Sequence, residues 1–125
     1  MKILLIGVGG FLGAISRYLV SEGAVRFFGD KLPFGTFIVN VTGSFILGAL
    51  LVLSLEKEVV GENMRFLLAV GFLGAFTTFS TFSVESIHLF RSGEYFSALS
   101  YITASVVVSL CAAFGGFTVA RLWGA

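Results

Sequence analysis

This chain of 125 residues is 57% hydrophobic and 12% charged, with a net charge of +1 and a mean hydropathy of +1.01. A soluble domain of this size needs far more polar surface, so the composition predicts an integral membrane protein with one small domain. The near-neutral charge and the lack of any run of Lys or Arg exclude nucleic acid as a partner. A single cysteine, Cys111, excludes a disulfide framework within the chain.

The first expected membrane span covers residues 3–21, an apolar run that only Arg17 interrupts. Gly9, Gly13 and Arg17 recur at every fourth position and therefore share one face of a helix. The two glycines favour close packing against another helix. Two interpretations of Arg17 stay open: its side chain snorkels to the membrane surface, or it marks a hydrated entrance for an anion.

The second expected span, residues 32–55, contains no charged residue. One face of it carries small and polar residues at every fourth position, namely Thr36, Asn40, Ser44 and Gly48. Ser44 and Gly48 favour helix packing. An amide inside a membrane is costly unless it is bonded, and it offers N–H donors, so we expect a function for Asn40.

The third expected span, residues 66–90, contains the uncharged stretch GFLGAFTTFSTFS at positions 71–83. Gly71, Gly74 and the β-branched pair Thr77–Thr78 weaken a helix, which predicts a break in mid-membrane. Non-helical backbone at that depth is tolerated only inside protein or beside water. Broken membrane helices expose carbonyl oxygens that can coordinate Na⁺. Mg²⁺ and Zn²⁺ are disfavoured because the stretch has no carboxylate, His or Cys.

Two aromatic rings follow the expected break. Phe79 and Phe82 lie three positions apart and project from nearly one helix face, with hydroxyl groups beside them at Ser80, Thr81 and Ser83. A phenyl ring has a positive edge, so edges turned inward can receive an anion without offering a full positive charge. Such a lining suits a small, strongly hydrated anion that must also be released. The alternative is that both rings only pack in the core or against lipid.

The fourth expected span, residues 95–122, carries Tyr101, Ser105 and Ser109 at every fourth position, until Ala113 ends the polar stripe. Four spans place both termini on one side of the membrane. The segments between the spans hold most of the charge and are expected to be connectors: Glu22–Pro33, Glu56–Arg65 and Arg91–Glu94.

Basic residues are distributed evenly between the two expected sides of the membrane. One side has Lys2, Lys57, Arg65 and Arg121, and the other has Arg17, Arg26, Lys31 and Arg91. The positive-inside rule needs an excess on one side to set an orientation. Two outcomes stay open: insertion in both orientations, which allows an antiparallel dimer of one gene product, and a single orientation set by the first helix.

At these motifs the chain resembles the Fluc (CrcB) family of fluoride ion channels. The stretch at 71–83 is the specific feature, supported by Gly35-Thr36 and Val39-Asn40 in the second span and, in the first, by Gly10, Gly13, Ala14 and Arg17. The resemblance covers the whole chain. It implies an all-α membrane protein of four transmembrane helices that forms an antiparallel, dual-topology homodimer with two pores. Such a channel exports fluoride passively from the cytoplasm across a bacterial-type inner (plasma) membrane and so lowers fluoride toxicity.

The resemblance also implies roles for individual residues. Carbonyl oxygens of Gly74 and Thr77 from both subunits would hold a structural Na⁺ at the dimer interface. Arg17 matches a vestibule arginine of the family, and Glu85 matches an acidic residue after the motif. Ala113 departs from the pattern, because some relatives extend the polar track with a hydroxyl group there. The implied fluoride path is lined by Asn40, Phe79, Phe82, Ser80, Thr81, Tyr101, Ser105, Ser109 and Thr36.

Other function classes fit the sequence less well. A small dual-topology multidrug or cation exporter has a similar length, but proton-coupled export needs a titratable carboxylate in mid-membrane. The only charge in the first span is Arg17, and Glu85 would serve only if it lay deep. An enzyme is disfavoured because no nucleophile–base pair is evident around His88, the single histidine, or Asp30, the single aspartate. A structural subunit would leave the polar stripes without a role.

Overall fold

The computed structural model of the protein describes residues 1–124, and its regular structure is entirely helical. Four helical segments are long and apolar enough to cross a membrane, which confirms an all-α fold with four spans, while the antiparallel homodimer stays a prediction: Lys2–Phe28, Phe34–Glu56, Glu62–Arg91 and Tyr95–Leu122. The individual elements are α1 (Lys2–Phe28), α2 (Phe34–Leu51), the π-helical η1 (Val52–Glu56), α3 (Glu62–Arg65), the π-helical η2 (Phe66–Leu73), α4 (Gly74–Phe76), α5 (Phe79–Arg91) and α6 (Tyr95–Leu122).

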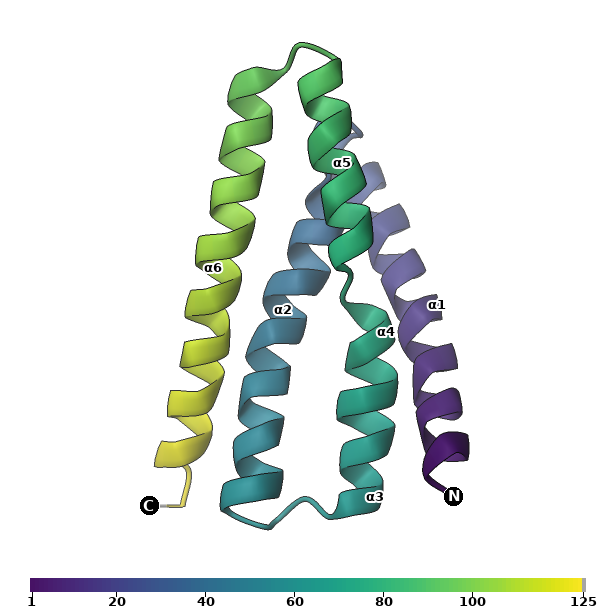
Figure 1. The fold of residues 1–125 in the computed structure, drawn as a ribbon, viewed down its shortest axis with the longest axis vertical. Coiled ribbons are helices and arrows are strands. Elements are labelled where there is room, and N and C mark those ends of the chain that lie inside the picture. Colours follow the sequence, from purple (N-terminus) through teal and green to yellow (C-terminus); the bar gives the residue numbers. More distant parts are fainter. Residues whose placement is uncertain (125) are drawn as a thin grey trace.

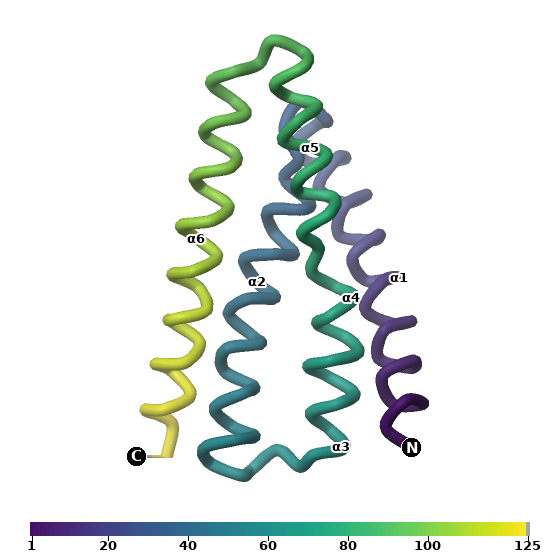
Figure 2. Tube along the Cα trace, viewed as in Figure 1, coloured from purple at the N-terminus to yellow at the C-terminus, as the bar shows by residue number. Residues whose placement is uncertain are grey.

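The helical segments run alternately up and down, so both termini lie at the same end of the molecule (Figure 1). The most extensive packing joins α2 to α6 and α1 to η2; α1 also packs against α2 and α4, while α5 rests against α6. The trace leaves its helical path between α4 and α5, about halfway along the third segment (Figure 2). This interruption therefore lies between α1 on one side and α2 and α6 on the other.

Two expected connectors are shorter than the charge pattern predicted. Helix α1 continues through Glu22 to Phe28, so most of the expected connector Glu22–Pro33 is helical. It ends at Gly29, whose φ of 80° is in the region that favours glycine and whose N–H donates to the Val25 carbonyl. The end of the expected connector Glu56–Arg65 is likewise helical, as α3. Charged residues end the apolar run, but they do not end a helix.

Glycines allow the closest helix contacts. A Cβ atom on Gly9 or Gly13 of α1 would overlap the backbone of η2, and one on Gly48 of α2 would overlap the backbone of α6. The packing role expected for these three glycines is therefore confirmed. From the other helix, Gly116 of α6 meets the backbone of α2 in the same way. Ser44, also expected to pack, instead lines a cavity described below.

Charged groups join the helices at the end of the molecule that holds both termini. Lys2 pairs with Glu62 at 3.4 Å, which links α1 to α3. Arg121 of α6 makes two hydrogen bonds to Glu56 of η1, at 2.8 and 3.0 Å. Both ion pairs found within residues 1–124 are at this end, and each joins elements that are distant in the sequence.

Candidate functional site

The third helical segment is interrupted by two residues with extended backbone. Helix α4 ends at Phe76, Thr77 has φ −89° and ψ 158°, and Thr78 has φ −154° and ψ 124°. Helix α5 then begins at Phe79, and the Thr78 hydroxyl oxygen accepts a hydrogen bond from the Thr81 N–H at 3.2 Å. Thr78 is thus the N-cap of α5, a position at which a threonine stabilises a helix start.

This interruption leaves backbone carbonyls without donors. In a continuous helix the Thr78 N–H would bond to the Gly74 carbonyl, and the Thr81 N–H would bond to the Thr77 carbonyl. Here the first donor goes to the Asn40 side chain and the second to the Thr78 hydroxyl. The carbonyl oxygens of Gly74 and Thr77 therefore accept no hydrogen bond from residues 1–124. Free carbonyls of this kind fit the ligand chemistry of Na⁺.

Side chains from two other helices bond to the backbone of the interruption. On α1, Arg17 Nε donates to the Ala75 carbonyl at 3.0 Å. On α2, Asn40 Nδ2 donates to the Thr78 carbonyl at 3.0 Å, and Asn40 Oδ1 accepts from the Thr78 N–H at 2.8 Å. Neither interpretation of Arg17 from the sequence included this bond to backbone. The vestibule role of Arg17 stays a prediction.

A cavity of about 360 Å³ lies directly beside the interruption and brings together five of the predicted path residues. None of the side chains that line it carries a charge. The Ser105 hydroxyl is buried and makes no hydrogen bond within residues 1–124. Buried polar groups normally have a partner, so this hydroxyl can still bond to a ligand or water. The cavity is lined by Asn40, Gly43, Ser44, Leu47, Thr77, Thr78, Phe79, Phe82, Ser105, Val106, Ser109 and Leu110.

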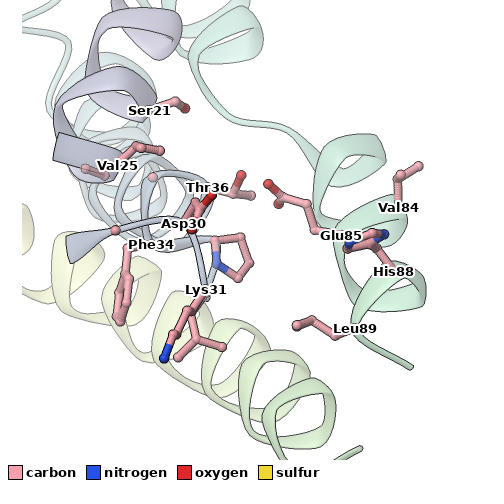
Figure 3. Close-up of a pocket in the computed structure, with 15 residues that line it drawn as sticks. Ser21, Val25, Asp30, Lys31, Phe34, Thr36, Val84, Glu85, His88 and Leu89 are labelled. Atoms are coloured by element: carbon pink, nitrogen blue, oxygen red, sulfur yellow. The ribbon is translucent and has the colours of Figure 1, made fainter. Parts of the chain in front are cut away.

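The other predicted path residues lie outside this cavity. Thr36 lines a second cavity of about 400 Å³, where it and Glu85 point toward one another from α2 and α5 (Figure 3). Tyr101 connects the two regions, since its hydroxyl donates to Glu85 Oε1 at 3.1 Å and its ring lies 5.3 Å from that of Phe82. Two further residues, Ser80 and Thr81, follow the interruption without lining either cavity.

Two features of the site were missed from the sequence. Ser44 and Gly43 both line the cavity, and a Cβ atom on Gly43 would overlap the Thr77 side chain. The sequence places Ser44 on the face of Asn40 but favours helix packing for it, and the spacing of three residues between Asn40 and Gly43 is the signal that would have added Gly43 to that face. The bonds from Asn40 to Thr78 had no such signal, because the two residues are 38 positions apart in the sequence.

Comparison with known proteins places the chain in a family. Residues 4–117 match the family described as "CrcB-like protein, Camphor Resistance (CrcB)". A "Fluoride-specific ion channel FluC" from Caulobacter sp. strain K31 is 46% identical over 121 residues, which are 96% of this chain and 94% of the relative. Relatives with the same name occur in Dehalococcoides mccartyi, 44% identical over 92% of this chain and 88% of the relative, and in Rhizobium etli, 43% identical over 97% of each.

Proposed function

This chain belongs to the CrcB family, and from that premise we propose that it is a fluoride-specific ion channel of the bacterial plasma membrane. The family is one of ion channels, so the protein is not an enzyme, and a multidrug or cation exporter is not favoured. Four helices suited to crossing a membrane support this location. Passive exit of fluoride from the cytoplasm would lower its toxicity.

The observation that carries the proposal is the unpaired Ser105 hydroxyl in an uncharged cavity. Fluoride is small and strongly hydrated, so a site that strips its water must supply hydrogen-bond donors instead. Asn40 adds a second donor, because a carboxamide has two N–H groups and only one is used on Thr78. No Lys or Arg lines the cavity, and the ion can therefore leave again.

We place the fluoride path along α6. Ser109, Ser105 and Tyr101 lie one helical turn apart on that helix and lead from the cavity beside the interruption toward Glu85 and Thr36. In this path the Phe79 and Phe82 rings offer their edges to the ion. Ser80 and Thr81 would contribute hydroxyl groups near its start, and Arg17 would add positive potential at the vestibule.

The functional unit of this proposal is an antiparallel homodimer. The cavity is open on one face of the single chain, and Phe79 at its rim is 77% exposed. A second copy packed on this face would enclose the path. It would also double the number of free carbonyls, so that Gly74 and Thr77 of both copies surround one structural Na⁺ on the twofold axis.

Fluoride efflux from proteoliposomes tests the function directly. Vesicles loaded with potassium fluoride and treated with a potassium ionophore should release fluoride rapidly, while chloride-loaded vesicles should not release chloride. Release without an imposed proton gradient excludes coupled export.

Ser105→Ala removes the unpaired hydroxyl and should slow efflux at least tenfold, roughly the worth of a hydrogen bond to an ion. Ser100→Ala, on an exposed position of the same helix, is the matched control. Parental vesicles that retain fluoride would refute the function.

A further inference from the structure

The Asn40 carboxamide makes both of its contacts with a single backbone residue. Its oxygen accepts from the Thr78 N–H at 2.8 Å, and its nitrogen donates to the Thr78 carbonyl at 3.0 Å. Thr78 is one of the two residues with extended backbone between α4 and α5. An amide side chain that bonds to both backbone groups of one extended residue acts on it as a neighbouring β-strand would.

These two bonds compete directly with the helix. A free Thr78 N–H would find the Gly74 carbonyl four residues earlier and continue α4. Asn40 Oδ1 takes this N–H, while Asn40 Nδ2 donates to the Thr78 carbonyl, so both backbone groups of Thr78 are bonded to α2. We infer that Asn40 is a positioning residue, which keeps the Thr77–Thr78 link extended through its two hydrogen bonds to Thr78.

This role has consequences on both sides of the link. Toward α4, it leaves the Gly74 carbonyl free for a cation. Toward α5, it fixes Thr78 as the N-cap and so sets the direction in which Phe79 and Phe82 project. The remaining N–H of Asn40 is still available to an anion in the cavity. One side chain thus couples the geometry of the cation site to that of the anion path. This coupling rests on the proposed channel function, whereas the positioning role itself does not.

Amide hydrogen exchange separates positioning from a simple contact with the ion. Asn40→Ala removes both bonds, and Asn40→Asp keeps the acceptor but replaces the donor with an oxygen that faces the Thr78 carbonyl. In both variants, exchange of the backbone amides in 77–82 should be faster than in the parent by about tenfold, as expected for the loss of one or two hydrogen bonds. Ser44→Ala, one turn away on the same cavity wall, should leave this exchange unchanged.

The acidic variant also supplies a rescue experiment. A protonated carboxyl group has one O–H donor and one acceptor, so it can replace both carboxamide bonds. At about pH 5.5 the amide exchange rate at 77–82 in Asn40→Asp should be within about twofold of the parental rate at the same pH. The reason is that a carboxyl group facing a carbonyl favours its neutral form. At about pH 9 it should not, and Asn40→Ala should show no recovery at either pH.

Other titratable groups are the same in all these proteins. None lines the cavity that contains Asn40. On the packed helices, Arg17 of α1 bonds to Ala75, and Glu85 and Tyr101 bond to each other. Comparing each variant with the parent at the same pH removes their contribution. If the ratio of the exchange rates of Asn40→Asp and the parent depends on pH, the introduced carboxyl group is therefore the cause.

Three results would overturn the inference. Parental exchange at 77–82 in Asn40→Ala would mean that Asn40 does not position the link. Faster exchange that extends to α6 would mean that Asn40 stabilises the whole fold. Failure of Asn40→Asp to recover at low pH would contradict the two-bond geometry. Each result is independent of whether the parent conducts fluoride, which the efflux measurement decides separately.

Discussion

Phe79 and Phe82 are three residues apart but lie in different surroundings. Phe82 is 8% exposed and packs against Tyr101, whereas Phe79 is 77% exposed at the rim of the cavity. Their ring centres are 5.6 Å apart, and the ring planes are tilted by 51°. A tilted pair presents edges as well as faces to the space beside it. A substitution at Phe82 therefore changes packing and path together, while one at Phe79 changes mainly the path.

We predict that Phe79→Ile and Phe82→Ile each slow fluoride efflux at least tenfold, because an aliphatic side chain fills space but has no positive edge. Methionine, which is flexible and polarizable, should be tolerated better at either position. Phe82→Ile should also lower the free energy of unfolding by about 1–3 kcal/mol, since it alters a buried site. Phe96→Ile, at an exposed position outside the cavity, is the control. Parental efflux from both isoleucine variants would show that the rings only pack.

Single residues also show the limits of what the sequence could predict about the site. The cost of an amide in a membrane singled out Asn40 as a candidate, and its function stays a prediction. Its partner could not be predicted, because a contact between α2 and the start of α5 depends on how the helices pack. Arg17 is a similar case. Its charge marked it as unusual, but the bond to the Ala75 carbonyl depends on the distance between α1 and α4.

At the scale of elements, the interruption of the third segment is the main feature. Helix α4 ends and α5 begins within three residues, and the two carbonyls at Gly74 and Thr77 stay unbonded within residues 1–124. Unbonded carbonyls away from water are costly, so some ligand must satisfy them in the membrane. A cation shared between two copies of the chain would do so without a carboxylate, and in residues 1–124 no cluster of acidic, His or Cys side chains forms a metal site.

We predict that removing Na⁺ weakens the protein. After exhaustive exchange into N-methylglucamine buffer, the dimer should dissociate or unfold at a lower temperature, because four carbonyl oxygens lose their common ligand. Thermal unfolding and size-exclusion profiles measure this, and stepwise return of Na⁺ should restore both. If assembly and efflux are unchanged without Na⁺, the carbonyls are satisfied in another way and the cation site is wrong.

The elements themselves could be predicted to different degrees. The second and fourth spans agree closely with the charge-free runs, since Phe34–Glu56 and Tyr95–Leu122 begin and end near charged residues or proline. The first helix is longer than its run, because Gly29 ends it rather than Glu22. The contact surfaces between helices were partly predictable, since Gly9, Gly13 and Gly48 lie where backbones approach.

At the scale of the whole molecule, the two ends differ in how their charges are used. The end with both termini has the ion pairs Lys2–Glu62 and Arg121–Glu56. The number of basic residues is nevertheless almost equal at the two ends, and this number, rather than the net charge, sets orientation. The basic residues therefore give little preference for either direction of insertion. This supports the proposal that two copies in opposite orientations form an antiparallel dimer.

We predict that two sets of substitutions fix opposite orientations. Ser92→Lys with Glu94→Lys adds positive charge at one end, and Glu58→Lys with Val59→Lys adds it at the other. A tag at the C-terminus, accessible in about half of the parental chains, should become uniformly protected in one variant and uniformly labelled in the other. Each variant alone should give little efflux, whereas both expressed together should restore it. Efflux from either variant alone at the parental rate would contradict the inverted dimer.

The bonds from α1 and α2 to the interruption also limit how this chain can change in length. Arg17 bonds to Ala75, two residues before the Thr77–Thr78 link, and Asn40 bonds to Thr78 within it, so the link is tied to two other helices. One residue inserted into the first turn of α5 would rotate everything beyond it by about 100°. The Phe82 ring would then lose its contact with the Tyr101 ring. In the loop at 57–61, Lys57 bonds to the Trp123 carbonyl, but no residue of this loop bonds to the interruption. Insertions and deletions should therefore accumulate in that loop during evolution, while the number of residues between Gly74 and Glu85 stays constant.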